Sequence, residues 1–270
     1  MTVLAGVSRA TYYRFDPEGI PAVKDVELRD AIQRVALKHP AYGRPRITAE
    51  LKRQGWEANH KRVGRILRED NLLCIRKQKF QTTTDSTDGH RIYKNLIRDV
   101  APTEPNQIWV ADITYIRLAE EFVYLAVVLD SYSRLLIGWA LERTLEAKLA
   151  VGALRMALDK RGTAAGLIHH SDRGVQYACG EYTQLLTDRG IQIRMSRKGN
   201  PYDNARAESF MKTLKHEEVH RVEYCSLAEA RRGIRHFLER TYNRKRLHSA
   251  IGYKPPAEFD KMARLEKVPA

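Results

Sequence analysis

The first part of the chain places apolar and polar residues at the spacing of amphipathic helices. Apolar side chains recur every three or four positions in residues 26–38, 46–54 and 61–69. The segment from His39 to Gly43 contains Pro40 and separates the first helix from the second. The polar faces of the other two helices are basic, and the residues that we expect to contact DNA are Arg46, Lys61, Arg62 and Arg65. This pattern predicts a helix-turn-helix-like DNA-binding region, although a small helical bundle without a ligand has the same pattern.

Beyond residue 106 the pattern changes to short apolar segments that are rich in β-branched and aromatic residues. Residues 107–118, 122–130 and 134–142 predict three strands in an antiparallel meander. The segments that follow predict, in order, a helix (146–161), a strand (166–170), a helix (181–189), a strand (191–195) and two long helices (203–220 and 227–242). This order predicts an α/β fold in which a mixed sheet has helices on both faces. It matches the RNase H-like fold, preceded by a small all-α module.

One polar stretch divides the chain. Residues 80–106 contain few apolar residues and include a run of Thr, Ser, Asp and Gly at 82–89, which is typical of a linker. We therefore expect a helical DNA-binding region at 1–79, a linker at 80–106, an RNase H-like core at 107–222 and a basic helical extension at 223–270.

Composition and charge narrow the class of protein. The chain has 43% hydrophobic residues and neither a membrane-spanning run nor a signal peptide, so we expect a soluble, cytoplasmic, nucleoid-associated protein with no membrane partner. Its net charge of +14 divides into +8 for residues 1–100, +1 for 101–200 and +5 for 201–270. A nearly neutral centre between basic flanks favours a nucleic acid as partner, while a solvated basic surface would give the same counts. The three cysteines are far apart, which predicts neither a disulfide framework nor a zinc ribbon.

Three carboxylates occupy positions that indicate a catalytic or metal-binding role. Asp112 lies in the middle of an apolar strand, where an ionised carboxylate is costly unless it is paired or binds a metal. Asp172 follows a short strand and precedes a glycine-containing turn, the place where open α/β sheets put ligand-binding groups. Glu208 lies on the long helix, and helical spacing puts it on one arc with Lys212 and Lys215.

Each carboxylate alone also has an ordinary structural interpretation. Asp112 could pair with a nearby Arg or Lys, Asp172 could shape its turn, and Glu208 could form an i,i+4 surface pair with Lys212. Together, three oxygen ligands that converge on a cleft suit Mg²⁺, with Mn²⁺ as a substitute. Two such ions can activate a nucleophilic oxygen and stabilise the leaving 3′ oxygen of a phosphodiester.

Three segments closely resemble the integrase core of bacterial insertion-sequence transposases. They are residues 106–116 (NQIWVADITYI), 170–177 (HSDRGVQY) and 196–215 (SRKGNPYDNARAESFMKTLK). The likeness is greatest to OrfB, the second-frame product of the IS-three family. Residues 242–248 and 252–256 also resemble that family, and residues 6–13 and 39–73 are similar to its second helix-turn-helix module.

The resemblance implies DDE chemistry on transposon ends, in which water cuts one strand and the freed 3′-OH attacks another phosphodiester. It implies that Asp112, Asp172 and Glu208 are the catalytic metal ligands, with two ions in each site. Lys212 and Lys215 would hold DNA near the scissile phosphate. In the basic extension, the expected DNA contacts are Arg244, Lys245 and Arg246.

The resemblance also implies partners. They are double-stranded DNA, as both transposon end and target, and further copies of the chain bound to that DNA. A first-frame OrfA product or fusion is a further expected partner, because no first-frame segment precedes residue 1. Two other functions stay open: a metal-dependent RNase H-like nuclease that hydrolyses without strand transfer, and a catalytically inactive DNA-binding regulator.

Overall fold

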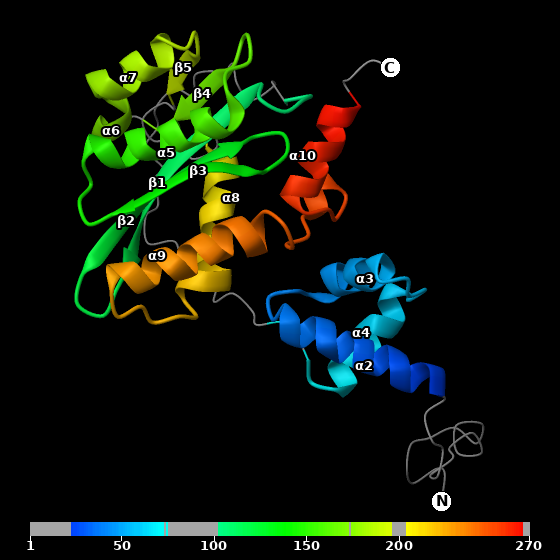
Figure 1. The fold of residues 1–270 in the computed structure, drawn as a ribbon. Helices are drawn as coiled ribbons and strands as arrows, with labels where there is room; N and C mark the ends of the chain where they lie inside the picture. The colour runs from blue at the N-terminus through cyan, green and yellow to red at the C-terminus, as the bar shows by residue number, and fades with distance from the viewer. Residues whose placement is uncertain (1–22, 73, 75–101, 173, 196–203, 267–270) are drawn as a thin grey trace, which may run out of the picture. The chain divides into compact units, whose positions relative to one another are not determined.

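The computed structural model describes residues 23–72, 74, 102–172, 174–195 and 204–266 (Figure 1). The chain divides into two compact units, Met1–Arg76 and Lys77–Ala270. Within the described residues no helix has the length and apolar character needed to cross a membrane. Most of the predicted linker and the segment 196–203 lie outside the described residues, so the predicted four-part division stays a prediction.

The first unit is a three-helix module. Its helices are α2 (Val23–Lys38), α3 (Arg44–Arg53) and α4 (His60–Glu69). A proline in the first turn of α3 fits there because that position has no intrahelical N–H bond to lose. Asn59 caps α4 by accepting a hydrogen bond from the Lys61 N–H at 2.9 Å. Fully buried side chains from all three helices, including Ile32, Ile47 and Ile66, form the core. The sequence had predicted these helices within a few residues.

The second unit is built on a mixed five-stranded sheet with strand order β3-β2-β1-β4-β5 (Figure 1). The strands are β1 (Ile108–Arg117), β2 (Phe122–Asp130), β3 (Leu136–Glu142), β4 (Ile168–Ser171) and β5 (Gln192–Met195). The first three form the predicted antiparallel meander, and β4 and β5 continue the sheet in parallel with β1. Buried Asp130 closes the β2–β3 turn by accepting hydrogen bonds from the Ser133 N–H and hydroxyl.

Helices cover both faces of this sheet. On one face, α5 (Ala147–Arg161), α6 (Val175–Ala178) and α7 (Gly180–Thr187) pack against Trp109, Ala111 and their neighbours. On the other face, α8 (Ala205–Leu214) and α9 (Leu227–Arg235) pack against Val110, Ile116 and the alternate residues of β2. The strands therefore sort their side chains between two cores by simple alternation. This arrangement confirms the predicted α/β, RNase H-like class.

Two of the helices continue as wider π-helical turns. Helix α8 runs into η1 (Lys215–Val219) and α9 into η2 (His236–Tyr242), where the sequence had predicted single long helices. The extension then adds a short turn, η3 (Ser249–Ile251), and helix α10 (Pro256–Leu265), which the sequence analysis did not place.

Buried ion pairs hold the extension against the rest of this unit. Arg246 contacts Glu217 of η1 at 2.7 Å, and Arg161 of α5 contacts Asp260 of α10 at 2.6 Å. All four side chains are at most 10% exposed. The extension is therefore packed onto the sheet domain and does not hang free from it.

Candidate active site

The sheet register brings two of the predicted carboxylates to the place where the pairing of β1 with β4 ends. Strands β1 and β4 are parallel neighbours, with Val110 opposite His170. Asp112 and Asp172 each follow two residues later in their own segments. Asp172 comes immediately after β4, at the carboxyl ends of the parallel strands, where ligand sites form in open α/β sheets.

Asp112 is largely buried, and its surroundings oppose its ionisation. Its side chain accepts a hydrogen bond from the Ile113 N–H at 2.9 Å. The pKa of Asp112 is raised to about 7: burial is the largest cause and the negative charges of Asp172 and Glu208 add to it, while the Ile113 N–H and Lys215 act in the opposite direction. The three carboxylates are therefore close enough to repel one another, with Lys215 near them.

Asp172 shapes the turn in which it lies. Its Oδ1 accepts a hydrogen bond from the Gly174 N–H at 2.9 Å. A Cβ at position 174 would lie only 3.0 Å from that oxygen, so glycine suits the turn. The side chain is also exposed. The turn-forming interpretation thus holds, and it leaves Asp172 accessible to a ligand.

Glu208 reaches the site from helix α8. The opposite side of α8 carries Phe210 and Leu214, which are buried in the core, as the helical spacing had predicted. Glu208 is 38% exposed and its carboxylate lies 3.4 Å from the Lys212 Nζ. The i,i+4 pair therefore exists, but such exposed pairs contribute little to stability and do not prevent Glu208 from taking another ligand.

Two residues that the sequence analysis missed also belong to this region. Asn204 is buried at the start of α8, and its Nδ2 donates a hydrogen bond to the Ala111 carbonyl at 3.0 Å, next to Asp112. Burial raises the pKa of the Tyr177 hydroxyl well above its usual value, and the nearby charges of Asp112 and Asp172 act in the same direction. Within the described residues neither this hydroxyl nor the Asn204 Oδ1 has a hydrogen-bond partner. Only Asn204 had a sequence signal, because Asn is favoured before the first turn of a helix.

The donor chemistry fits a divalent cation, but the coordination shell is not closed. Among the described residues no three His, Cys, Asp or Glu side chains lie close enough to enclose an ion. The carboxylates of Asp172 and Glu208 are held by the Gly174 N–H and by Lys212, respectively. Hard oxygen donors that repel one another around a buried carboxylate are nevertheless what Mg²⁺ or Mn²⁺ would stabilise.

The predicted DNA contacts of the second unit divide into exposed and buried groups. Lys212 is 70% exposed, and Lys215 lies with its Nζ 4.6 Å from the centre of the Tyr115 ring. Arg244 and Lys245 are exposed. Arg246, in contrast, is 5% exposed and binds both carboxylate oxygens of Glu217. Its guanidinium has a structural role, so Arg246 leaves the proposed set of DNA contacts.

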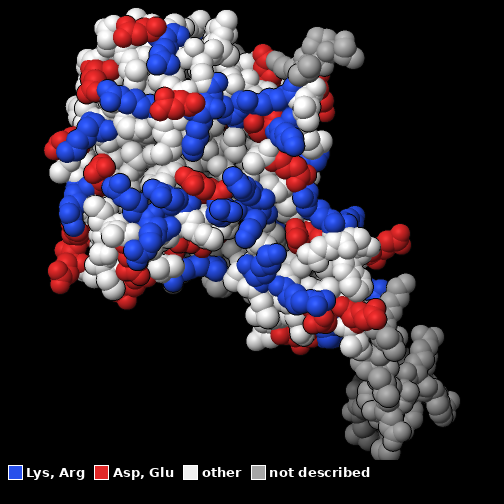
Figure 2. Space-filling view, in the orientation of Figure 1, with Lys and Arg blue, Asp and Glu red and all other residues white. Residues whose placement is uncertain are grey.

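The predicted contacts of the first unit lie on its surface. Lys61 and Arg65 of α4 are exposed, and Arg65 pairs with Glu69 at 3.0 Å. Arg62 is half-buried. The Arg46 guanidinium lies 5.7 Å from the centre of the Tyr42 ring. Figure 2 shows Lys and Arg side chains on both units, with a dense group over α9 in the second.

Comparison with known proteins assigns the chain to a family. The family model described as an integrase core domain matches residues 102–201, a second one of the same description matches 189–256, and an HTH-like domain matches 24–80. Transposase InsF for insertion sequence IS3A of Escherichia coli (strain K12) is 40% identical over 220 residues, which cover 81% of this chain and 76% of that protein. The chain belongs to the IS-three (IS3) family of insertion-sequence transposases.

Other relatives extend over nearly all of this IS3-family chain. The insertion element IS600 uncharacterized 31 kDa protein of Shigella sonnei is 38% identical over 96% of this chain and 97% of its own length. The transposase for insertion sequence element IS904 of Lactococcus lactis is 38% identical over 89% of this chain and 97% of its own. Among solved structures, a chain of the simian T-cell lymphotropic virus intasome in complex with PP2A regulatory subunit B56 gamma matches with a TM-score of 0.53. At 16% identity, covering 89% of this chain and 77% of that one, this match supports the fold alone.

Proposed function

We propose that this IS3-family transposase cuts and joins DNA strands at insertion-sequence ends, using Asp112, Asp172 and Glu208 as the ligands of a divalent metal. The observation that carries this proposal is the register of β1 and β4. Asp112 and Asp172 both lie two residues beyond the last β1–β4 pair, while α8 packs beside β1 and brings Glu208 to the same region.

The raised pKa of Asp112 supports a cation in this region. A buried carboxyl beside two other carboxylates gains stability when a positive charge joins them. Bound Mg²⁺ or Mn²⁺, as one ion or two, would activate the attacking oxygen and stabilise the leaving one. The chain itself fixes the carboxylates, through the β1–β4 register, the Gly174 turn and the anchoring of α8 by Asn204.

The lysines on the Glu208 side of α8 and η1 would bind the DNA backbone. Lys212 is exposed and Lys215 lies near Asp112, so each can place a positive charge beside a phosphate at the site. The exposed Arg244 and Lys245 and the basic face of α4 would contact DNA farther from the chemistry. Because strand transfer acts on two ends and a target, we also propose that several copies of the chain assemble on DNA. The comparisons give no support for a first-frame OrfA partner, and we do not propose one.

The test is a strand-joining assay on labelled insertion-sequence end oligonucleotides with Mg²⁺ or Mn²⁺. We expect Asp172→Asn to reduce joining by at least about 100-fold. Changing a residue that only hydrogen-bonds to a metal ligand already lowers activity about 10- to 100-fold, and Asp172 is proposed to bind the metal directly. Asp159→Asn, which removes an exposed carboxylate near the C-terminus of α5, is the matched control and should join at the wild-type rate. Equal activity in both variants would contradict the assignment of Asp172.

The same assay distinguishes the alternative functions. Nicked products without joined products, lost in Asp172→Asn, would favour the nuclease. DNA binding with neither product, in any divalent metal, would favour the inactive regulator. Joined products that depend on Asp172 are expected only of the transposase.

A further inference from the structure

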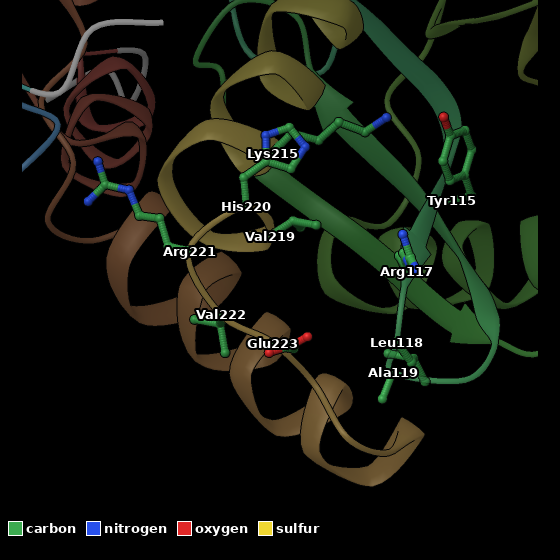
Figure 3. Close-up of a pocket in the computed structure, with 10 residues that line it drawn as sticks. All are labelled: Tyr115, Arg117, Leu118, Ala119, Lys215, Val219, His220, Arg221, Val222 and Glu223. Atoms are coloured by element: carbon green, nitrogen blue, oxygen red, sulfur yellow. The ribbon is translucent and has the colours of Figure 1, made fainter. Parts of the chain in front are cut away.

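A cavity of about 560 Å³ lies beyond the carboxylates, between the end of β1 and the segment that follows α8 (Figure 3). Tyr115 and Arg117 of β1 form one wall, and Lys215 of η1, with His220, Val222 and Glu223 after it, forms the other. Its volume is in the range of pockets that hold small ligands. It is too small for a DNA duplex, but large enough for one unpaired nucleotide.

The walls of this cavity are firmly held. The Ala119 N–H donates a hydrogen bond to the Tyr224 carbonyl at 3.0 Å, which joins the β1–β2 turn to the loop after η1. Tyr224 is buried, and its hydroxyl donates to the Glu218 carboxylate at 2.7 Å. A cavity between anchored segments is a preformed site, which costs a ligand little ordering energy.

The lining combines cations with an exposed aromatic ring. In Figure 3 the Lys215 side chain extends toward Tyr115, and Arg117 lines the same cavity from a position two residues farther along β1. Tyr115 remains 59% exposed although Lys215 and the edge-on ring of Phe122 contact it. Phosphates bind cations and bases stack on exposed aromatic rings, so this combination suits a nucleotide of a single strand.

The cavity and the candidate active site share one stretch of β1. Strand β4 pairs with β1 only from Ile108 to Val110, so within the described residues the rest of β1 has no strand neighbour on that side. Asp112 and Tyr115 both lie on this unpaired stretch, about 10 Å apart at about 3.3 Å per residue. Lys215 contributes to both places.

We infer that this cavity binds an unpaired nucleotide of the DNA strand that passes through the active site. Its base stacks on Tyr115, and its phosphates contact Lys215 and Arg117. The inference rests on the proposed DNA-joining function, which supplies a strand at Asp112. Binding at the cavity needs no cut, and it is therefore measured separately from catalysis.

Base stacking is tested with the full chain in EDTA, on a DNA duplex with a short unpaired tail that contains 2-aminopurine. Wild type should quench the 2-aminopurine fluorescence, because a stacked base loses emission. Tyr115→Phe keeps the ring and should keep the quenching, whereas Tyr115→Ala should lose it and bind at least about 5-fold more weakly. Quenching that survives in Tyr115→Ala would overturn the stacking role.

The charges of the cavity are tested by anisotropy titration of the same tailed DNA. Arg117→Ala should weaken binding and lower the salt slope by about one, whereas Arg155→Ala, which removes an exposed charge of α5 that does not line the cavity, should do neither. Glu223→Gln removes the acid from the lining and should tighten binding, a gain that a poorly folded variant cannot give.

The outcomes separate this inference from the proposed function. If Arg117→Ala and Glu223→Gln bind tailed DNA like wild type while Asp172→Asn abolishes joining, the cavity does not bind the strand and the proposed chemistry stands. If the cavity variants behave as expected but joining does not depend on Asp172, the cavity is a DNA site and the catalytic assignment fails. Equal effects on blunt and tailed duplexes would show that duplex DNA, and not an unpaired nucleotide, is bound.

Discussion

His169 of β4 shows what burial does to one ionisable side chain in this fold. It is fully buried, and its Nε2 lies 2.9 Å from the Tyr182 hydroxyl. Burial, with a smaller effect of His170, lowers the pKa of His169 from 6.5 to about 3. The unfolded chain therefore binds a proton as the pH falls below 6.5, while the folded chain does not. The contribution of His169 to the free energy of unfolding is therefore full above pH 6.5 and is lost as the pH falls toward 3.

His169→Gln removes that pH dependence. Between pH 7 and pH 5 the wild type should lose about 2 kcal/mol through His169, at about 1.4 kcal/mol per unit below the unfolded pKa. In His169→Gln this part of the loss should be absent, whatever the variant's stability at pH 7. Tyr182→Phe keeps the histidine buried and should keep the wild-type slope. Urea unfolding of the three proteins at both pH values makes the measurement, and an unchanged slope in His169→Gln would contradict it.

Arg244 and Arg246 have the same side chain but different roles. Breaking the buried Arg246–Glu217 pair with Arg246→Met should cost about 3–5 kcal/mol of unfolding free energy, because the buried Glu217 carboxylate would lose the guanidinium that binds both of its oxygens. Arg244→Ala, at an exposed position, should change stability by less than about 0.5 kcal/mol. It should instead weaken DNA binding and lower the salt slope by about one. Urea unfolding and anisotropy on both variants test this pair, and equal stabilities would contradict it.

The sequence identified residues whose type conflicts with their local pattern. Asp112 stands out because it interrupts an apolar strand, and Asp172 because a glycine turn follows it. Tyr177 gave no signal, since a buried tyrosine on a short helix is ordinary. The role of Arg246 was equally hidden, because its partner Glu217 is 29 positions away and only the tertiary structure brings the two together.

At the scale of elements, Gly138 marks a close approach of β3 to α5. A Cβ at this position would lie 2.1 Å from the Ala153 carbonyl oxygen and 2.9 Å from the Ala157 Cβ. Gly138→Ala should therefore force the helix away from the sheet and cost at least about 2 kcal/mol. Gly152→Ala, in the middle of α5, meets only the Ala140 Cβ at 3.4 Å and should stabilise by up to about 1 kcal/mol. Opposite shifts in urea midpoint are expected, and a tolerated Gly138→Ala would contradict this packing.

Element prediction succeeded where one periodicity extends over a whole segment. The meander strands and α5 follow their apolar patterns closely. The two π-helical turns were not predicted, because segments of 5 and 7 residues are too short for the wider spacing of a π-helix to show in the apolar pattern. Helix α10 was missed for another reason: its buried contact is the Asp260–Arg161 ion pair and not an apolar stripe. A charged residue on a short helix predicts an exposed position. Asp260 is buried only because it pairs with Arg161 of α5.

At the scale of the whole molecule, the DNA contacts proposed for the first unit should be separable from the proposed chemistry, because the two lie in different units. Lys61→Ala combined with Arg65→Ala removes two exposed charges from α4. We expect weaker DNA binding and a salt slope lower by about two, since each phosphate contact contributes about one. Joining at saturating DNA should remain at the wild-type rate, because the carboxylates lie in the other unit. Asp172→Asn should behave in the opposite way, with normal binding and no joining.

A matched double variant makes this comparison specific to α4. Lys148→Ala with Arg155→Ala removes two exposed charges from α5, so net charge changes equally in both double variants. If the α5 variant weakens binding as much as the α4 variant does, the effect comes from the general field of a basic protein and not from a helix-turn-helix contact. If only the α4 variant weakens binding, and joining recovers fully at high DNA concentration, the first unit holds the DNA and the sheet domain cuts and joins it.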